Sequence, residues 1–316
     1  MTVWSEEQGK YVDIESDISS FTTRPEGQTT AYLTSGEIPY VALSGTTADG
    51  YEKFPSSSDS DYQTYRSKWY RFGVSGNSGQ MVVTHAFKYN GKQMRNYTML
   101  YDKSKKAALW VAFAMHADAF PWLIDRSDKW EYDPALEDSW QPNLSSSYGE
   151  TGNDDYDRGH QVASNDRRTT TYQTRQTSYF SNMTPQIKGF NGGVWSTLEG
   201  KVQELGQATS GRDTLYVVTG PIFGSGYKTD ARDADNAVCP VATQYFKCIM
   251  KVSYNNSGVA TSAKGAAYLF DHKTGASRQD KTIDQIETLT GFDFFANIPE
   301  AIQNTAEGSF TDLFDN

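Results

Sequence analysis

The residues that could carry chemistry are concentrated between Asp157 and Glu199. This stretch holds His160, one of only four histidines in the chain, directly after Asp-Arg-Gly, and Asn191 lies eight positions before Glu199. Histidine is the side chain that can accept a proton near neutral pH. An amide oxygen with a carboxylate nearby can hold a Mg²⁺ ion that keeps most of its water. Together these groups indicate metal-assisted cleavage of a phosphodiester, with His160 as the general base.

Each of these residues also has an ordinary structural explanation. A lone His is more often structural than catalytic, an Asn before a helix is commonly an N-cap, and a Glu on an amphipathic helix is commonly solvated. Arg158 adds a fixed positive charge of the kind that holds phosphate. The joint spacing of base, oxygen ligand, acid and cation favours the catalytic interpretation over the separate structural ones.

The same spacing resembles that of the DNA/RNA non-specific endonucleases of the ββα-metal class, relatives of mitochondrial endonuclease G. The segment Asp157–His160 matches the DRGH signature of that family, and Asn182–Gln186 matches its N-x-x-P-Q segment. Asn191 falls where the family carries its metal-binding Asn, and Glu199 falls where it carries an acid. The resemblance covers about residues 80–316.

This resemblance implies a role for each matching residue. His160 would be the general base, Asn191 the sole direct protein ligand of Mg²⁺, and Glu199 a holder of the metal's water shell. Mn²⁺ or Ca²⁺ would also fit such a site. The implied catalytic residues are His160, Arg158, Glu199 and Asn182, and the implied substrate contacts are Arg158, Arg167, Gln186 and Arg126.

The sequence departs from the family pattern at three places. Gln203 stands one helical turn after Glu199, where many relatives have an Arg, and Ser164 stands where a proline is expected. Arg126 and Lys129 compete for the place of an upstream Arg that contacts phosphate. These departures bear on the rate and on which cation holds the phosphate, and they leave the base and the metal ligand unchanged.

The net charge of −10 counts against a nucleic-acid partner, because proteins that bind nucleic acids are usually basic. Residues 80–316 are only mildly acidic, with 28 acidic and 23 basic side chains. Within residues 157–175 four arginines outnumber two aspartates. Since the local field at a groove matters more than the net charge, we expect metal-dependent substrate binding that is weaker than a tight basic clamp.

Hydrophobic periodicity predicts the elements that must position these residues. Strands are predicted at residues 81–89, 95–102, 107–116, 214–219, 244–254 and 265–271, with Gly220-Pro221 ending the fourth. Helices are predicted at residues 194–207, 283–289 and 298–304. We expect an α+β fold with a central, mainly antiparallel sheet, helices on both faces and a ββα-metal active-site motif at one edge. Residues 1–79 would form a small β-rich accessory segment, and residues 80–316 the nuclease domain.

The cysteine content and the start of the chain bear on the compartment. Cys239 and Cys248 are the only two cysteines, and we predict a disulfide between them that stabilises by about 2–3 kcal/mol; two buried thiols are the alternative. No apolar run is long enough to span a membrane. The segment Met1–Trp4 is polar and shows no signal peptide. We expect a secreted, periplasmic or cell-surface protein from which a leader has been removed.

The expected function is Mg²⁺-dependent hydrolysis of DNA and RNA without sequence preference, giving 5′-phosphate products, with a single hydrated metal. Two alternatives stay open. One is a phosphodiesterase that acts on small nucleotides, and the other is a catalytically weak or inactive nucleic-acid-binding or surface-binding protein of the same fold. A homodimer, and a carbohydrate or surface contact by residues 1–79, also stay open.

Overall fold

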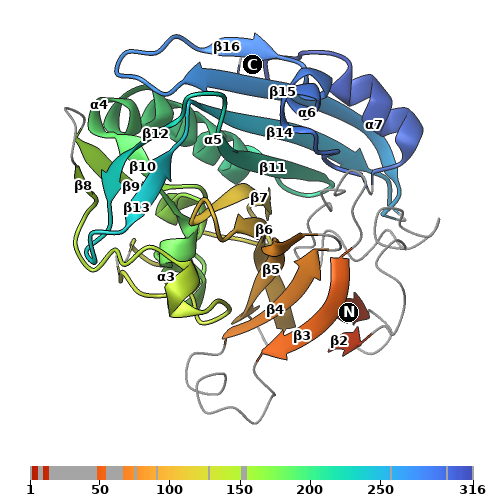
Figure 1. Ribbon diagram of the computed structural model, residues 1–316. Helices are drawn as coiled ribbons and strands as arrows, with labels where there is room; N and C mark the ends of the chain where they lie inside the picture. Colours follow the sequence, from red (N-terminus) through yellow and green to blue (C-terminus); the bar gives the residue numbers. More distant parts are fainter. Residues whose placement is uncertain are drawn as a thin grey trace.

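A nine-stranded sheet forms the centre of the computed structural model, which describes residues 2–5, 10–13, 48–54, 67–74, 77–89, 92–126, 129–150, 155–256, 258–296 and 298–314. Every pair of neighbouring strands in this sheet is antiparallel (Figure 1). The strand order is β16 (Gln279–Lys281), β15 (Ala260–Asp271), β14 (Gln244–Tyr254), β11 (Asp213–Ile222), β7 (Ala107–Met115), β6 (Lys92–Asp102), β5 (Asn77–Tyr89), β4 (Ser67–Val74) and β3 (Ala48–Phe54).

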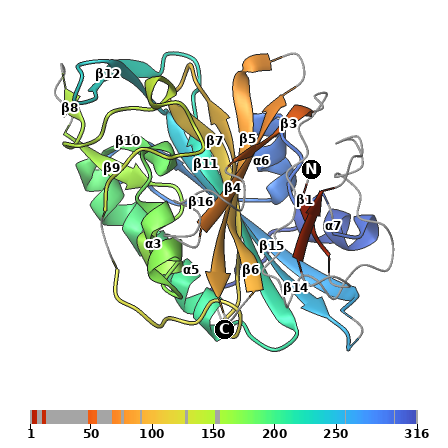
Figure 2. The ribbon, with the colours of Figure 1, turned by 90° about the horizontal axis from the view of Figure 1, so that it is seen from below.

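Helices cover the sheet on both faces (Figure 2). One face carries α3 (Thr171–Thr177) and α5 (Ser196–Ala208), and the other carries α6 (Ile283–Thr290) and α7 (Glu300–Glu307). The central strand β7 has the apolar sequence AALWVAFAM, and it is buried at every position except Leu109 because helices cover both of its faces. The predicted α+β fold is confirmed. Within the described part of the chain, no helix is both long and apolar enough to cross a membrane.

All six predicted strands are present, as β5, β6, β7, β11, β14 and β15. The prediction that Gly220-Pro221 ends the fourth strand is wrong, because β11 continues to Ile222. Pairing between β11 and β7 stops at Thr219, whereas pairing with β14 continues through Pro221. Beyond Thr219 the strand has a neighbour on one side only, and proline is tolerated there as it is on an edge strand.

Three smaller sheets complete the strand list. Strand β9 (Tyr156–His160) pairs with β10 (Met183–Ile187), β1 (Thr2–Ser5) pairs with β2 (Lys10–Asp13), and β12 (Lys228–Arg232) lies between β13 (Val238–Val241) and β8 (Gly149–Glu150). Most of residues 1–79 lie outside the described ranges. The described strands β3 and β4 extend the main sheet next to β5, which begins at Asn77. The division of the chain at residues 79 and 80 stays a prediction.

Local sequence signals set the boundaries of α6. Thr282 and Gln285 form a capping box at the start of this helix, and Gly291 ends the helix in the left-handed conformation at φ 74°. The short helical turns are η2 (Asp138–Trp140), η3 (Ser164–Asp166), η4 (Phe180–Asn182), α4 (Lys188–Phe190) and the π-helical η5 (Asn191–Trp195).

The predicted disulfide is wrong, because both cysteines are free and buried. Cys239 lies opposite Ala231 in the small three-stranded sheet and packs in a separate cluster with Leu144. Cys248 lies on β14 in the main core. Closeness in sequence did not bring the thiols together, because the strands that carry them belong to different sheets. Burial raises the pKa of Cys239 to about 12, so this thiol is unreactive at neutral pH.

Strand β15 approaches α7 closely at Gly265. A Cβ atom there would lie 2.4 Å from the carbonyl oxygen of Ala306 and 2.8 Å from Cδ1 of Ile283. We expect Gly265→Ala to destabilise the fold by about 1–3 kcal/mol, as overpacking does. Gly200→Ala is the matched control, because its Cβ would meet nothing within 4 Å and alanine favours a helix by about 0.5–1 kcal/mol. Thermal unfolding of both variants measures this, and equal melting temperatures would contradict it.

Candidate active site

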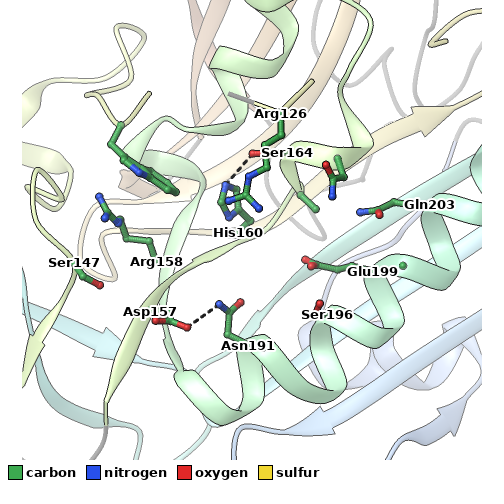
Figure 3. Close-up of a pocket in the computed structure, with 15 residues that line it drawn as sticks. Arg126, Ser147, Asp157, Arg158, His160, Ser164, Asn191, Ser196, Glu199 and Gln203 are labelled. Atoms are coloured by element: carbon green, nitrogen blue, oxygen red, sulfur yellow. Dashed lines mark hydrogen bonds between the residues drawn. The ribbon is translucent and has the colours of Figure 1, made fainter. Parts of the chain in front are cut away.

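Three elements aim their side chains into one pocket of about 450 Å³. His160 comes from the end of β9, Asn191 from the π-helical turn η5, and Glu199 from the first turn of α5 (Figure 3). The residues that line the pocket are Arg126, Trp130, Ser147, Asp157, Arg158, His160, Ala163, Ser164, Asn165, Asn191, Gly192, Ser196, Glu199, Gly200 and Gln203. Residues that are 39 positions apart in the sequence thus share one site.

The strand pair β9–β10 holds His160 at the pocket wall. Arg158 and His160 are two residues apart on β9, so their side chains leave the same face of the strand. Gly159 lies between them and meets the side chain of Gln186 on β10. A Cβ atom at Gly159 would come within 2.2 Å of Cγ of Gln186, so only glycine lets the two strands pack at this point. The glycine of the DRGH segment therefore has a packing role next to the base.

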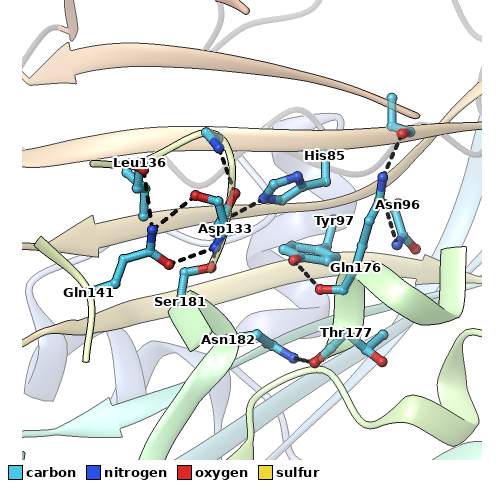
Figure 4. Close-up of polar contacts among 12 residues, drawn as sticks. His85, Asn96, Tyr97, Asp133, Leu136, Gln141, Gln176, Thr177, Ser181 and Asn182 are labelled. Carbon is cyan, nitrogen blue, oxygen red and sulfur yellow. Dashed lines mark hydrogen bonds and ion pairs between the residues drawn. The ribbon is translucent and has the colours of Figure 1, made fainter. Parts of the chain in front are cut away.

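A buried polar network fixes the chain on both sides of β9 and β10 (Figure 4). The Asn182 side chain accepts a hydrogen bond from the Val162 amide at 3.0 Å and donates to the Val162 and Thr177 carbonyls at 3.0 and 2.8 Å. Next to Asn182, the Ser181 hydroxyl donates to Asp133, whose carboxylate also lies 2.9 Å from Nε2 of His85. Because these groups are fully buried, the network restricts how the segment that carries His160 can move.

The surroundings of Asn191 differ from the prediction. Asn191 was expected just outside a helix that begins near Val194, but the helical segment starts at Lys188, and Asn191 has helical dihedral angles of φ −57° and ψ −55°. The π-helical turn between Asn191 and Trp195 contains a kink, because Gly193 has the non-helical dihedral angles φ −106° and ψ −110°. The Asn191 amide donates from Nδ2 to Oδ2 of Asp157 at 3.0 Å. Because the amide nitrogen of Asn191 points to Asp157, the amide oxygen Oδ1 of Asn191 points in the opposite direction.

Glu199 lies in a charged but partly desolvated corner of the pocket. Burial raises the pKa of its carboxyl group to about 7, Lys247 opposes this rise, Asp166 adds to it, and Arg126 opposes it. Lys247 is 1% exposed and lies under α5, with its Nζ 4.8 Å from the centre of the Trp195 ring. Neither Lys247 nor Asp166 was predicted from the sequence as a residue of the site. A lysine inside the apolar run of β14 was the available signal.

Arg158 keeps its cation at the pocket by stacking. Its guanidinium lies 4.3 Å above the Trp130 ring and donates to the carbonyl oxygen of Leu144 at 3.0 Å. The Trp130 ring also lies 5.3 Å from the ring of His160. Trp130 therefore spaces the base from the cation, a role that the sequence did not indicate. Of the two competing upstream cations, Arg126 lines the pocket and is exposed.

Three of the predicted site residues do not line the pocket. Arg167 is 0% exposed, and its guanidinium lies 4.5 Å from the Phe113 ring and donates to the carbonyl oxygen of Ala114 at 2.8 Å. This position does not fit a contact with substrate. Asn182 and Gln186 are also 0% exposed and act through packing and hydrogen bonds on neighbouring chain segments. Asp157 had no predicted role, but its carboxylate accepts the hydrogen bond from the side-chain amide of Asn191.

The other histidines have structural environments. His85 is paired with Asp133 in the interior, and His116 is 5% exposed with Nε2 3.3 Å from the carbonyl oxygen of Gly211. His272 accepts the Ile187 amide at Nε2 and donates from Nδ1 to the Ala242 carbonyl. None of these three lines the pocket, so among the histidines only His160 can act there.

Comparison with known proteins agrees with this arrangement. Residues 78–301 match the family model for DNA/RNA non-specific endonucleases. The chain is 28% identical to a nuclease of Nostoc over 242 residues, which cover 73% of this chain and 83% of the relative. It is 28% identical to a nuclease of Serratia marcescens over 236 residues, with 73% and 80% covered. Human mitochondrial endonuclease G is 27% identical over 166 residues, which cover 50% of this chain and 54% of that protein.

A solved structure shares the fold. The crystal structure of the EndoG/EndoGI complex contains a chain that matches with a TM-score of 0.51 and 22% identity, covering 69% of this chain and 88% of that one. The family match extends over most of this chain and includes the whole pocket from Arg126 to Gln203. The protein therefore belongs to the DNA/RNA non-specific endonuclease family and is a hydrolytic endonuclease.

Proposed function

We propose that this pocket hydrolyses phosphodiester bonds of DNA and RNA with Mg²⁺ as cofactor and without sequence preference. The observation that carries the proposal is the convergence of His160, Asn191 and Glu199 on one pocket, with Arg158 and Arg126 beside them. Strand β9, strand β10 and helix α5 would together form the ββα-metal motif. A plasmid and an RNA transcript digested with and without EDTA test the proposal directly.

His160 would take a proton from the attacking water, since imidazole is the ordinary base at neutral pH. Arg158 would bind the phosphate as a fixed cation, because its stacking on Trp130 and its bond to Leu144 already hold it in place. Exposed Arg126, which also lines the pocket, would add a second positive charge. This route does not use a ribose 2′-hydroxyl, so both DNA and RNA would be cut, and breaking the bond to the 3′ oxygen would leave a 5′-phosphate.

The donor atoms of the pocket fit a hard cation. Asn191 offers Oδ1 because Asp157 takes its amide nitrogen, and Glu199 offers a carboxylate whose pKa burial raises to about 7. A cation bound beside this carboxylate would stabilise its charged form. Amide and carboxylate oxygens with remaining water ligands suit Mg²⁺, and also Mn²⁺ or Ca²⁺. Asn191 would hold the metal directly and Glu199 through water. When bound, Mg²⁺ would neutralise charge that develops on the phosphate and the leaving oxygen.

Secretion stays a prediction. Bacterial and mitochondrial proteins both occur among the relatives, so members of the family work in more than one compartment. The free thiols remove the disulfide as support for an oxidising compartment, and the polar composition is the support that remains.

Removing the base should abolish most turnover while DNA still binds. We expect His160→Ala to lower the cleavage rate by about 10²–10⁴-fold, the usual contribution of a positioned base. DNA affinity in Ca²⁺ should change little, because Arg158 and Arg126 remain. A stable His160→Ala protein that digests DNA and RNA at nearly the wild-type rate would remove His160 from the mechanism.

Removing the amide oxygen should weaken the metal site without unfolding the protein. We expect Asn191→Ala to lower both Mn²⁺ affinity, measured by electron paramagnetic resonance, and cleavage. Asn191→Asp should keep more of both, because it retains an oxygen at the same place. Ser196→Ala is the matched control on the adjacent turn, since its exposed hydroxyl has no role in the proposal. Unchanged Mn²⁺ affinity in Asn191→Ala would show that the metal lies elsewhere.

The raised pKa of Glu199 predicts a pH-dependent stability without metal. Its pKa is about 7 in the folded protein against 4.5 ordinarily, so the folded state holds the extra proton between these values. The cost of ionising this carboxyl is absent below pH 4.5 and complete above about pH 7, and it is at most on the order of 3 kcal/mol. In EDTA, wild type should therefore lose more stability from pH 5 to pH 8 than Glu199→Gln does.

Other raised carboxyls, such as Glu287 at about 7 and Glu307 at about 9, are present in both proteins and cancel in this comparison. Denaturant unfolding at the two pH values gives the difference. Mg²⁺ should recover stability in wild type at pH 8 and do less in Glu199→Gln. Equal pH dependence of the two proteins would contradict the desolvated state of Glu199.

A further inference from the structure

The His160 side chain continues into a row of hydroxyl groups that leads away from the pocket. Nε2 of His160 lies 3.3 Å from Oγ of Ser164 (Figure 3), and that oxygen lies 3.0 Å from Oγ1 of Thr177. Oγ1 of Thr177 lies 2.6 Å from the carbonyl oxygen of Thr174. Ser164 and Thr177 are 2% and 0% exposed, so bulk water does not compete for these bonds.

The direction of every hydrogen in this row follows from its far end. A carbonyl oxygen can only accept, so Thr177 donates its single hydroxyl hydrogen to Thr174. Thr177 can then only accept from Ser164, and Ser164 uses its own hydrogen for that bond. Ser164 is left as an acceptor towards His160, which places the ring hydrogen on Nε2. A neutral imidazole that carries its hydrogen on Nε2 accepts protons at Nδ1.

We propose that Ser164 and Thr177 are positioning residues that hold neutral His160 as the Nε2–H tautomer, so that Nδ1 is the nitrogen that takes the proton from water. The inference rests on the proposed role of His160 as the general base. Once His160 is protonated, its Nε2–H bond to Ser164 persists, and the aligned hydroxyl dipoles that end on the Thr174 carbonyl stabilise the positive ring.

The scaffold holds the row in this order. Thr177 is the last residue of α3, and its own carbonyl accepts the Asn182 amide at 2.8 Å (Figure 4). The side chain of Thr170 accepts the Gln173 amide at the start of the same helix. Ser164 begins η3, the turn that follows β9. Helix α3 therefore supplies the carbonyl oxygen of Thr174 at one end of the row. The chain segment that carries His160 and Ser164 forms the other end.

The test removes one hydroxyl group from the row and keeps the shape of the side chain. Thr177→Val removes the acceptor for Ser164, whose hydroxyl can then rotate and donate to Nε2, which moves the ring hydrogen to Nδ1. Thr177→Ser keeps the hydroxyl and should rescue. Thr171→Val is the same substitution at an exposed position of the same helix and serves as the control. We expect Thr177→Val to lower kcat about 3- to 10-fold with KM unchanged, the usual worth of one such bond.

Nitrogen-15 spectra of ring-labelled protein report the tautomer without any turnover, with His160 assigned by the signals lost in His160→Ala. Wild type, Thr177→Ser and Thr171→Val should show the Nε2–H form, and Thr177→Val should gain the Nδ1–H form. If Thr177→Val does not fold, Ser164→Ala should show the same mixture. An Nδ1–H ring in wild type, or Thr177→Val with wild-type spectra and kcat, would overturn the inference. A wild-type protein that cleaves nothing would instead refute the proposed function, while the spectra would still decide the tautomer.

Discussion

The position of Asn191 depends on two buried aromatic rings that stand on either side of it. Phe190 and Trp195 are both 0% exposed, their ring centres lie 5.7 Å apart, and both contact Tyr245 of β14. In a regular α-helix, residues five apart point in clearly different directions, but here the kink at Gly193 interrupts the helix between the two rings, and both rings reach the core. With both rings in the core, the residues between them must face outward. Asn191 is thereby turned towards Asp157 on β9.

This aromatic anchor also links the helix to the charges of the pocket. Lys247 lies under the Trp195 ring, fully inside the protein. Its positive charge opposes the rise in pKa that burial causes at Glu199, which lies on the next turn after Trp195. Gln203, one helical turn after Glu199, forms a hydrogen bond to the buried carboxylate of Asp166. On the side of α5 that faces the sheet, the cation near Glu199 is therefore Lys247 of β14.

An acidic protein can still place fixed cations at its pocket. The net charge is −10, yet Arg158 and Arg126 line the pocket while Asp157 is bonded to Asn191. Stacking on Trp130 holds Arg158 with little freedom to lose on binding. In the proposed function, such a pocket would attract phosphate through its local field, and a bound metal would add the remaining positive charge.

Local pattern was sufficient for most of the fold and for the chemistry of the site. The six main strands and the boundaries of α6 followed from periodicity, capping residues and one glycine, which are properties of neighbouring positions. The types and spacing of His160, Asn191 and Glu199 identified residues that the structure brings into one pocket. Short polar strands such as β12 and β16 were not predicted, because three to five residues leave no clear alternation to read.

The tertiary structure decided which polar side chains face the pocket and which support it. Arg167 and Arg168 are adjacent in sequence, but Arg167 packs on Phe113 inside the protein while Arg168 bonds to the loop at Ile124, and burial of this kind depends on partners more than 40 positions away. The same holds for Lys247 beneath Glu199 and for the separation of Cys239 from Cys248. Sequence by itself determined the chemical groups and the local elements that carry them. Only the packing of those elements determined solvent access, charge and the direction of each hydrogen bond, because these depend on atoms contributed by distant parts of the chain.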